Sequence, residues 1–266
     1  MQPIDRRAFC ATLGSLAALS GCGILEIVKG ETDKAIEMVG EPFRSVTILS
    51  FNVRAGLGLD NVRDISRAAE VIMRVKPDFV ALQEIDRGTR RSRGVDQLAE
   101  LERLTEMKGT WCKTIDYDDG EYGIALLSRE VPTHVRRVAL PSAGEPRMLL
   151  SAEFPRHVVA VTHLPLDEMS RLACVPKFRE LLREDKPVFL AGDWNDVPTS
   201  EFVKKMRMPF ALVSGFEPTF PANQPERCID FVAVSRRHRP RFEHVTHEVL
   251  PEAVVSDHRP VLVKLR

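Results

Sequence analysis

The chain has little cysteine, few aromatic residues and no net charge. Its five cysteines in 266 residues form neither the closely spaced pairs of a zinc site nor a disulfide framework. Lys plus Arg and Asp plus Glu each total 38, and aromatic residues make up 6% of the chain. This balance gives no support for a general polyanion-binding protein, although it is compatible with a local basic patch.

The sequence also lacks an internal repeat, and its apolar run near the amino terminus, residues 8–19, is shorter than the roughly 20 residues that cross a bilayer. Arg6 and Arg7 precede this run and small residues follow it, as in an export signal. The segment resembles a twin-arginine leader, and Leu19 to Cys22 resembles the bacterial lipobox, whose cysteine is diacylated and becomes the mature amino terminus. The alternative is an ordinary signal peptide with an incidental cysteine.

We therefore expect residues 1–22 to be a twin-arginine-type lipoprotein signal, residues 23–44 a tether and residues 45–266 one folded domain. The protein would then be exported to the cell envelope and anchored to a membrane face through the lipid on Cys22. Three cysteines remain in the domain, and this odd number leaves at least one free thiol unless a cysteine pairs between chains. They are Cys112, Cys174 and Cys228.

The stretch 186–195, Lys-Pro-Val-Phe-Leu-Ala-Gly-Asp-Trp-Asn, is an apolar run that ends in a carboxylate and an amide. Its length, its opening proline and the glycine near its end predict a buried strand with Asp193 and Asn195 at its carboxyl end. Two residues apart in an extended chain, these side chains point to the same side, where one accepts a proton and the other donates hydrogen bonds. The alternative is a strand followed by an Asx turn.

Two earlier apolar runs, residues 46–53 and 79–84, are also predicted to be buried strands. Each ends in a polar side chain, Asn52 in the first and Glu84 in the second. A helix beginning at a cap on Asn61 would connect them by a right-handed crossover. That connection would place both polar side chains at the same edge of one parallel pair.

The rest of the domain alternates apolar runs with helical patterns. The expected strands cover residues 110–115, 122–128, 135–140, 148–154, 157–164, 228–235 and 260–264, and the expected helices cover residues 95–107, 167–183 and 200–206. The even spacing of the first four strands predicts an antiparallel sheet. Pro176 would kink or divide the second helix.

More polar residues stand at the ends of these strands. His163 closes one strand, Asp230 lies in the next, and Asp257 and His258 precede the last. A lone histidine at a strand end is commonly structural, which is the alternative for His163.

Oxygen ligands in this set favour a hard metal ion. Carboxylate and amide oxygens of Asn52, Glu84 and Asp257 suit Mg²⁺ or Mn²⁺, and the lack of a cysteine or paired-histidine ligand set argues against structural zinc. A hard divalent ion in turn implies a phosphate-ester substrate.

The order of six short segments resembles the endonuclease/exonuclease/phosphatase superfamily. The segments are Phe-Asn-Val, Leu-Gln-Glu, Thr-His-Leu, Gly-Asp-Trp-Asn, Ile-Asp-Phe and Ser-Asp-His, and the resemblance covers Val46 to Leu265. It implies an α/β (α+β) fold, a four-layered α/β sandwich in which two mixed β-sheets are packed between helices. The chain is most similar to the compact bacterial metal-dependent hydrolases of that superfamily, which makes residues 45–266 the catalytic domain.

The resemblance also implies roles for the polar residues. Glu84 would be the main metal ligand, and Asn52 and Asp257 would complete or support the site.

In the same resemblance, Asp193 would orient and deprotonate the attacking water, and Asn195 and His163 would bind phosphate oxygens. His258, held by Asp230, would do the same or assist proton transfer. This chemistry is in-line displacement at phosphorus, in which the metal and fixed donors neutralise developing charge.

A polar loop rich in arginine, residues 87–93, is expected to bind the substrate. Arg90 and Arg91 are the expected anion contacts and Tyr122 lines the site, whereas a solvated charge cluster is the alternative. The other basic run, residues 236–241, is expected to be a solvated turn.

We expect a monomeric phosphoesterase acting on a small phosphodiester or phosphomonoester, such as a lipid headgroup or a sugar phosphate of the cell envelope. A secreted endonuclease or exonuclease acting on nucleic acid is the less favoured alternative. A non-catalytic binding lipoprotein on the same scaffold is the alternative from another functional class.

The lipobox interpretation predicts that Cys22→Ser prevents lipid attachment and releases the protein from the membrane, because diacylation requires the thiol. Changing Arg6 and Arg7 together to Lys should block export. Membrane fractionation of both variants measures these outcomes, and an unchanged membrane-bound fraction for Cys22→Ser would count against the lipobox.

Overall fold

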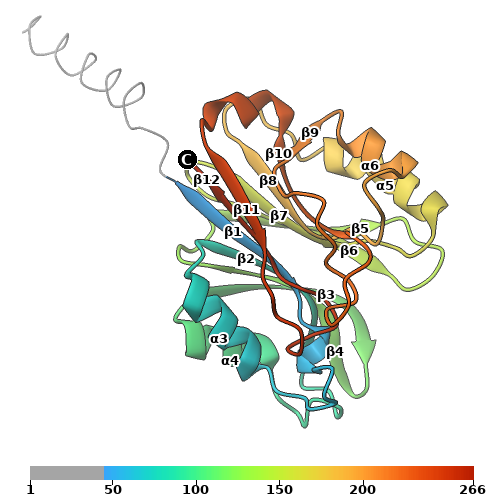
Figure 1. The fold of residues 1–266 in the computed structure, drawn as a ribbon. Coiled ribbons are helices and arrows are strands. Elements are labelled where there is room, and N and C mark those ends of the chain that lie inside the picture. The colour runs from blue at the N-terminus through green and yellow to red at the C-terminus, as the bar shows by residue number, and fades with distance from the viewer. Residues whose placement is uncertain (1–44) are drawn as a thin grey trace, which may run out of the picture. The chain divides into compact units, whose positions relative to one another are not determined.

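The computed structural model describes residues 45–266, which form two mixed six-stranded sheets (Figure 1). The signal, the tether and Cys22 lie outside these described residues. The first sheet has the strand order β11-β12-β1-β2-β4-β3. Its strands are β1 (Val46–Asn52), β2 (Phe79–Arg87), β3 (Lys108–Tyr117), β4 (Gly120–Ser128), β11 (Val245–Val249) and β12 (Val261–Leu265).

The second sheet repeats this plan with the order β5-β6-β7-β8-β10-β9. Its strands are β5 (His134–Leu140), β6 (Arg147–Glu153), β7 (Val158–His163), β8 (Val188–Asp193), β9 (Phe210–Leu212) and β10 (Asp230–Ser235). The helices are α3 (Ser66–Val75), α4 (Gln97–Thr105), α5 (Glu168–Arg179) and α6 (Glu201–Met206), with the 3-10 helices η1 (Arg54–Gly56) and η2 (Arg236–Arg241).

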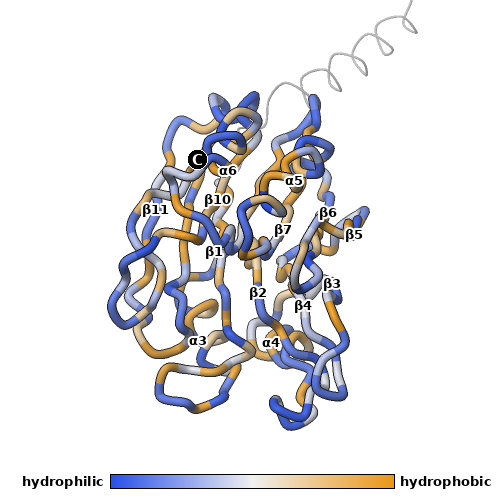
Figure 2. The backbone as a smooth tube through the Cα atoms, turned by 90° about the vertical axis from the view of Figure 1, so that its right-hand side faces the viewer, coloured by the Kyte–Doolittle hydropathy of each residue, from blue (hydrophilic) through white to orange (hydrophobic). Residues whose placement is uncertain are grey.

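Helices cover the outer face of each sheet, and the two sheets pack against each other through their inner faces, which gives four layers. In β1, Leu49 and Phe51 pack with α3 and α4, whereas in β8, Val188 and Leu190 pack with α5 and α6. Since side chains alternate along a strand, the residues between them face the other sheet. Ring contacts link these inner faces, as where the Phe79 and Phe154 centroids lie 5.0 Å apart. The predicted sandwich of two mixed sheets between helices is therefore confirmed, and hydrophobic residues occur along both the strands and the helices (Figure 2).

Each sheet contains one parallel pair among its described strands. β1 pairs with β2, and β7 pairs with β8, while the remaining strand pairs are antiparallel. The crossovers run through α3 and α5. Both pairs end in predicted site residues, because β1 ends at Asn52 and β8 at Asp193.

Two helix predictions were wrong in detail. Asn61 does not cap α3, which begins at Ser66, because the preceding residues fold back as a loop closed by a bridge between Leu57 and Arg63. Of the two outcomes predicted for Pro176, division of the helix is wrong, because α5 continues through Pro176, which lies in its last turn and removes one backbone donor there. The Ser200 side chain caps α6 by accepting a hydrogen bond from the Val203 amide.

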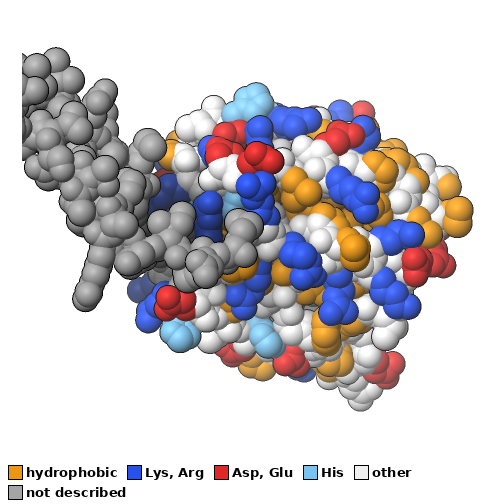
Figure 3. All heavy atoms as spheres, turned by 90° about the horizontal axis from the view of Figure 1, so that it is seen from above, with side chains coloured by type: hydrophobic (Ala, Val, Ile, Leu, Met, Phe, Trp, Pro, Cys, Tyr) orange, Lys and Arg blue, Asp and Glu red, His pale blue; other side chains and the backbone are white. Residues whose placement is uncertain are grey.

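The basic run 236–241 forms the surface helix η2. Arg236 is exposed and donates to backbone carbonyls, and exposed Arg237 pairs with Glu184. Seen from above, Lys and Arg side chains are scattered among hydrophobic and acidic ones (Figure 3). No helix in the described part of the chain is long and apolar enough to cross a membrane.

The three cysteines of the domain are all buried and free. The expectation of at least one free thiol is met by Cys112, Cys174 and Cys228 alike.

Candidate active site

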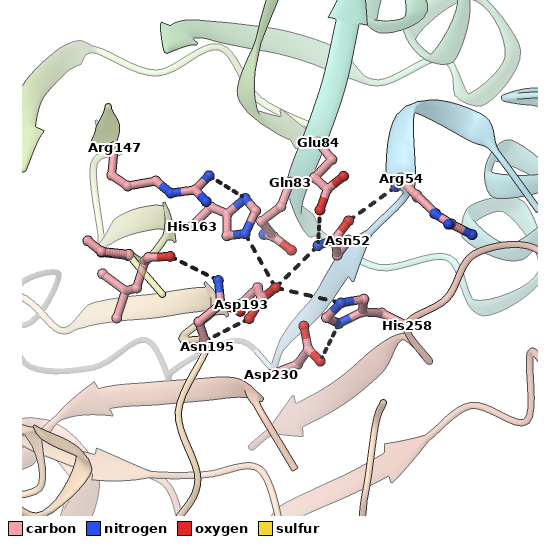
Figure 4. A network of polar contacts seen from close by, with 12 residues as sticks. Asn52, Arg54, Gln83, Glu84, Arg147, His163, Asp193, Asn195, Asp230 and His258 are labelled. Carbon is pink, nitrogen blue, oxygen red and sulfur yellow. Dashed lines mark hydrogen bonds and ion pairs between the residues drawn. The ribbon is translucent and has the colours of Figure 1, made fainter. Parts of the chain in front are cut away.

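The predicted site residues meet where the two parallel pairs end. Asn52 and Asp193 lie on the inner faces of their sheets, and the Asn52 amide nitrogen donates to Asp193 Oδ2 at 3.2 Å (Figure 4). His163 is the register partner of Asp193 in the neighbouring parallel strand, and Asp230 is its partner in the antiparallel one. Strand register therefore brings three of the predicted groups to one point between the sheets.

Glycine immediately before Asp193 lets the two parallel strands approach. A Cβ on Gly192 would meet the Thr162 carbonyl oxygen at 2.0 Å, and its φ is +153°. Only a residue without a side chain fits this position.

A β-bulge turns Glu84 toward the site. Val80, Leu82 and Ile85 all belong to the helix-side core, so the spacing of that face changes from two residues to three at this point. The pairing of β2 with β4 shifts register there, and Glu84 takes a left-handed φ of 59°. Without the bulge Glu84 would point into the apolar core, whereas with it the carboxylate faces the site, half-buried.

The Asn52 amide holds Glu84 as well as Asp193. Its nitrogen donates to Glu84 Oε1 at 2.9 Å, and its oxygen accepts from the Arg54 backbone N–H at 3.1 Å. The amide oxygen is thus turned to the backbone, and Asn52 orients the Glu84 carboxylate in this arrangement instead of offering its oxygen to a cation.

Asp193 lies between two imidazoles, 3.5 Å from His163 Nε2 and 3.7 Å from His258 Nε2 through its Oδ2 atom. The other ring nitrogen of His258 contacts Asp230 Oδ2 at 2.9 Å. Asp230 is held in turn by the Thr219 hydroxyl, which donates to the same oxygen at 2.5 Å. All five of these side chains are buried, so the contacts form away from bulk water.

His163 is neutral with its proton on Nε2. The Arg147 guanidinium, 3.3 Å away, can only donate, so His163 Nδ1 must accept. Burial holds the pKa of His163 well below its usual value, and the charges of Arg147 and His258 lower it further. The Nε2–H group therefore points at Asp193 as a neutral donor.

His258 is in the opposite state. Burial works against its protonation, but the nearby carboxylates of Asp230 and Asp193 outweigh that effect and raise its pKa above the usual value. Burial in turn raises the pKa of Asp193, while the His258 charge opposes the rise. Two histidines with opposed pKa shifts beside one carboxylate can supply a neutral and a cationic donor at the same point.

Asn195 agrees with both interpretations of this segment, the polar strand end and the Asx turn. Its backbone N–H donates to Asp193 Oδ1 at 2.8 Å, which is an Asx turn, and its φ is 50°. Its side-chain nitrogen donates to the Leu164 carbonyl at 2.9 Å, so the amide is held beside the His163 strand end. The Asx turn, which was the alternative interpretation of this segment, therefore positions the Asn195 side chain, which was the predicted hydrogen-bond donor.

The acidic groups fit a divalent cation. Burial raises the pKa of Glu84, and the charge of Asp257 raises it further. Two repelling carboxylates with oxygen donors are the environment that a hard cation relieves. Asp257 is only partly balanced by Arg54, whose Nε lies 3.3 Å from its Oδ2.

A second group in the described chain could also hold a metal ion, namely Asp193, Asp230 and His258, whose ligand atoms lie within 4.8 Å of one another. Asp230 and His258 are already hydrogen-bonded to each other. The Glu84 and Asp257 pair, made of oxygen donors, better suits Mg²⁺ or Mn²⁺.

The residues expected to contact the substrate, Arg90, Arg91 and Tyr122, already have partners within the protein. Exposed Arg90 pairs with Asp118 at 3.0 Å, and Arg91 makes two hydrogen bonds of 2.8 Å to buried Asp86. Tyr122 is buried beneath Arg91, with the guanidinium carbon 5.5 Å from its ring centroid. The structure therefore brings Arg91 and Tyr122 together but gives both arginines carboxylate partners.

Sequence reasoning missed three functional candidates, Arg54, Arg147 and Thr219. Arg147 is 7% exposed and reaches His163, and the other two hold Asp257 and Asp230. Arg54 could have been predicted from the sequence, because it lies two residues after Asn52, directly beyond the end of a predicted strand. Nothing local distinguished Arg147, which opens an antiparallel strand.

Comparison with known proteins shows which family the chain matches. The Endonuclease/Exonuclease/phosphatase family matches residues 49–258. The sequence has no significant match among curated proteins.

Solved structures share the fold at low identity. An endonuclease/exonuclease/phosphatase from Beutenbergia cavernae is 23% identical with a TM-score of 0.66, covering 84% of this chain and 72% of that one. A mannosyl-6-phosphatase from Bacteroides thetaiotaomicron is 21% identical with a TM-score of 0.65, covering 83% and 99%. The TDP2 protein of Caenorhabditis elegans is 17% identical with a TM-score of 0.62, covering 84% and 97%.

The geometry predicts that His163 is neutral at the pH where an ordinary histidine titrates, because burial lowers its pKa, and that it carries its proton on Nε2. Arg147→Met should raise its pKa, though only in part because burial is the larger cause, and should free the tautomer. Nitrogen NMR of the imidazole checks both points, with exposed Arg137→Met as the control. Titration of His163 near its ordinary pKa in the unaltered protein would contradict this assignment.

Proposed function

The chain belongs to the endonuclease/exonuclease/phosphatase family, and from this premise we propose that it is a divalent-metal-dependent phosphoesterase. Members of the family are generally phosphoester hydrolases, and they typically use divalent metals. The observation that carries the proposal is the convergence on Asp193 Oδ2 of the Asn52 amide and the Nε2 atoms of His163 and His258. That arrangement surrounds one carboxylate oxygen with groups suited to an anionic reaction centre.

In the proposed reaction, Asp193 orients the attacking water and accepts its proton. A raised pKa suits this role, because a general base works best when its pKa lies near the operating pH. Neutral His163 and the Asn195 amide bind non-bridging phosphate oxygens. Cationic His258, fixed by Asp230, stabilises the charge that develops there.

The residues that would hold the metal are Glu84 and Asp257, with Asn52 fixing the Glu84 carboxylate. A bound Mg²⁺ or Mn²⁺ would supply charge neutralisation at the phosphate.

For the substrate, we favour a small phosphodiester or phosphomonoester, such as a lipid headgroup or a sugar phosphate. The balanced net charge supports a small substrate over a long polyanion. The mannosyl-6-phosphatase among the structural neighbours is in keeping with a sugar phosphate. Arg90 and Arg91 would approach the anion from the loop after β2.

We also propose that the enzyme works in the cell envelope, tethered through Cys22. The support is the leader-like sequence alone, in which Arg6 and Arg7 precede a short apolar run and a lipobox-like segment. A tether would bring the domain close to an envelope substrate.

Asp193→Asn is expected to lower phosphoester hydrolysis by about 10²–10⁴-fold, because it removes the proton acceptor. The melting temperature should hardly change, since a buried carboxyl with a raised pKa tolerates a neutral isostere. The assay covers sugar phosphates, phospholipids, plasmid DNA and single-stranded RNA, with exposed Asp185→Asn as the control.

Near-normal turnover by folded Asp193→Asn would contradict this mechanism. Efficient, salt-sensitive cleavage of plasmid DNA would make the protein a nuclease. Binding of an ester without any turnover would point to a non-catalytic lipoprotein.

Chelation is expected to abolish activity, and added Mg²⁺ or Mn²⁺ should restore it. Glu84→Gln should raise the metal concentration needed for half-maximal activity by at least about tenfold, because it removes the charged oxygen donor. Metal titrations of this variant and of exposed Glu70→Gln give the comparison. Full activity in excess chelator would rule out the metal.

A further inference from the structure

A loop folds back beside the metal-binding residues proposed above. After β1, Arg54 and Ala55 both take left-handed φ values, 48° and 49°. The bridge between Leu57 and Arg63 then returns the chain, so that Arg63 Nη1 donates to the Ala55 carbonyl at 2.6 Å. Consecutive non-glycine residues in this region are strained, and such strain clusters at functional sites.

Three arginines are gathered around this loop, Arg54, Arg63 and Arg91, which we term the arginine cluster. Burial lowers the pKa of Arg63 and the charges of Arg91 and Arg54 lower it further, whereas the charge of Asp86 raises it. Like charges held this closely repel one another unless anions lie between them.

Their carboxylate partners do not balance the cluster. Arg91 is paired with Asp86, and Arg54 with Asp257. Arg63, which is half-buried, makes its hydrogen bond to a carbonyl and has no carboxylate within ion-pair distance among the described residues. Arg63 therefore has no ion-pair partner of its own among the described residues, and Asp86, whose charge also acts on Arg63, is already hydrogen-bonded to Arg91. A cation bound by Asp257 would draw that carboxylate away from Arg54.

A purely structural role does not explain Arg63. The Ala55 carbonyl that it contacts also accepts from the Gln97 side chain at 2.8 Å, and Gln97 is buried. The backbone group would stay satisfied without the guanidinium. An uncharged side chain at this position would leave the loop equally well hydrogen-bonded and would avoid the repulsion between Arg63 and the charges of Arg54 and Arg91.

The cluster adjoins the reaction site on the side of Glu84. The Arg54 backbone donates to Asn52, the residue that holds Glu84. Arg91 lies over Tyr117 at 4.4 Å and over Tyr122 at 5.5 Å. Tyr122 is the register partner of Asp86 on β2, the strand that also carries Glu84, so the ring under Arg91 lies beside the strand of the proposed metal ligand.

We propose that Arg63 is the centre of an anion subsite that binds a second anionic group of the substrate while the first phosphate lies at Asp193. The inference rests on the proposed phosphoesterase function and narrows its substrate class to small phosphate esters whose alcohol part carries another phosphate or carboxylate. Arg91 and Arg54 flank this group, and exposed Tyr117 offers a ring face to the connecting carbons. Specificity between singly and doubly anionic esters then resides in Arg63.

The test compares fructose 6-phosphate with fructose 1,6-bisphosphate, which share a sugar and differ by one phosphate. We expect kcat/KM for the bisphosphate to be at least about tenfold higher than for the monophosphate, because its KM is lower. One additional charge-assisted hydrogen bond to the second phosphate accounts for a difference of this size. Arg63→Gln should remove this preference and leave turnover of the monophosphate unchanged. Arg63→Lys should retain part of it.

The control is Arg93→Ala, which removes an exposed arginine of the neighbouring loop outside the cluster and should keep the preference. Equal kcat/KM values for the two sugars, or a preference that survives in Arg63→Gln, would overturn the subsite. Preference for an oligonucleotide over both sugars, lost in Arg63→Gln, would also overturn the proposed class, because the second anion would then be a neighbouring nucleotide phosphate.

Calorimetry separates failure of the subsite from failure of the proposed function. Inorganic pyrophosphate should bind the full-length protein more tightly than inorganic phosphate, and Arg63→Gln should lose this difference whether or not the protein hydrolyses any ester. Absence of turnover together with that binding difference would refute the phosphoesterase and keep the subsite. Normal turnover without the binding difference would refute the subsite alone.

Discussion

One side-chain amide joins the two sheets at the place where the chemistry is proposed. Asn52 is fully buried, and its nitrogen donates to Glu84 in its own sheet and to Asp193 in the other. An amide nitrogen has two hydrogens, so it can hold two carboxylates at a fixed separation despite their repulsion. The spacing between the expected metal ligand and the expected base thus depends on how the sheets pack.

The site is held by backbone conformations that the surrounding fold must enforce. Glu84, Asn195 and Arg54 all have left-handed φ values, each of which costs about 1–3 kcal/mol in a non-glycine residue. The bulge at Glu84 lies between strands whose apolar side chains are fully buried on the helix side. Packing of the core therefore compensates for strain at the points where polar groups turn toward the substrate.

A buried ion pair connects the loops that follow β7 and β8. Arg171 donates to Asp196 at 2.8 Å and to the carbonyls of Pro165 and Leu166. These loops directly follow His163 and Asn195, so the pair keeps the two expected phosphate contacts in register. Both ions are buried, and loss of either would leave an uncompensated charge near the site.

The sequence by itself determined the strands and the polar groups at their ends, because apolar runs, their lengths and the residues that close them are local features. Asp193 and Glu84 could be located in this way, whereas the bulge that aims Glu84 could not, since it depends on pairing with β4. The protonation of His163 and the lack of an ion-pair partner for Arg63 among the described residues depend on the tertiary structure. Each arises from burial and from arginines distant in the chain, and electrostatic interactions of that kind depend on separation in space, which local sequence does not encode.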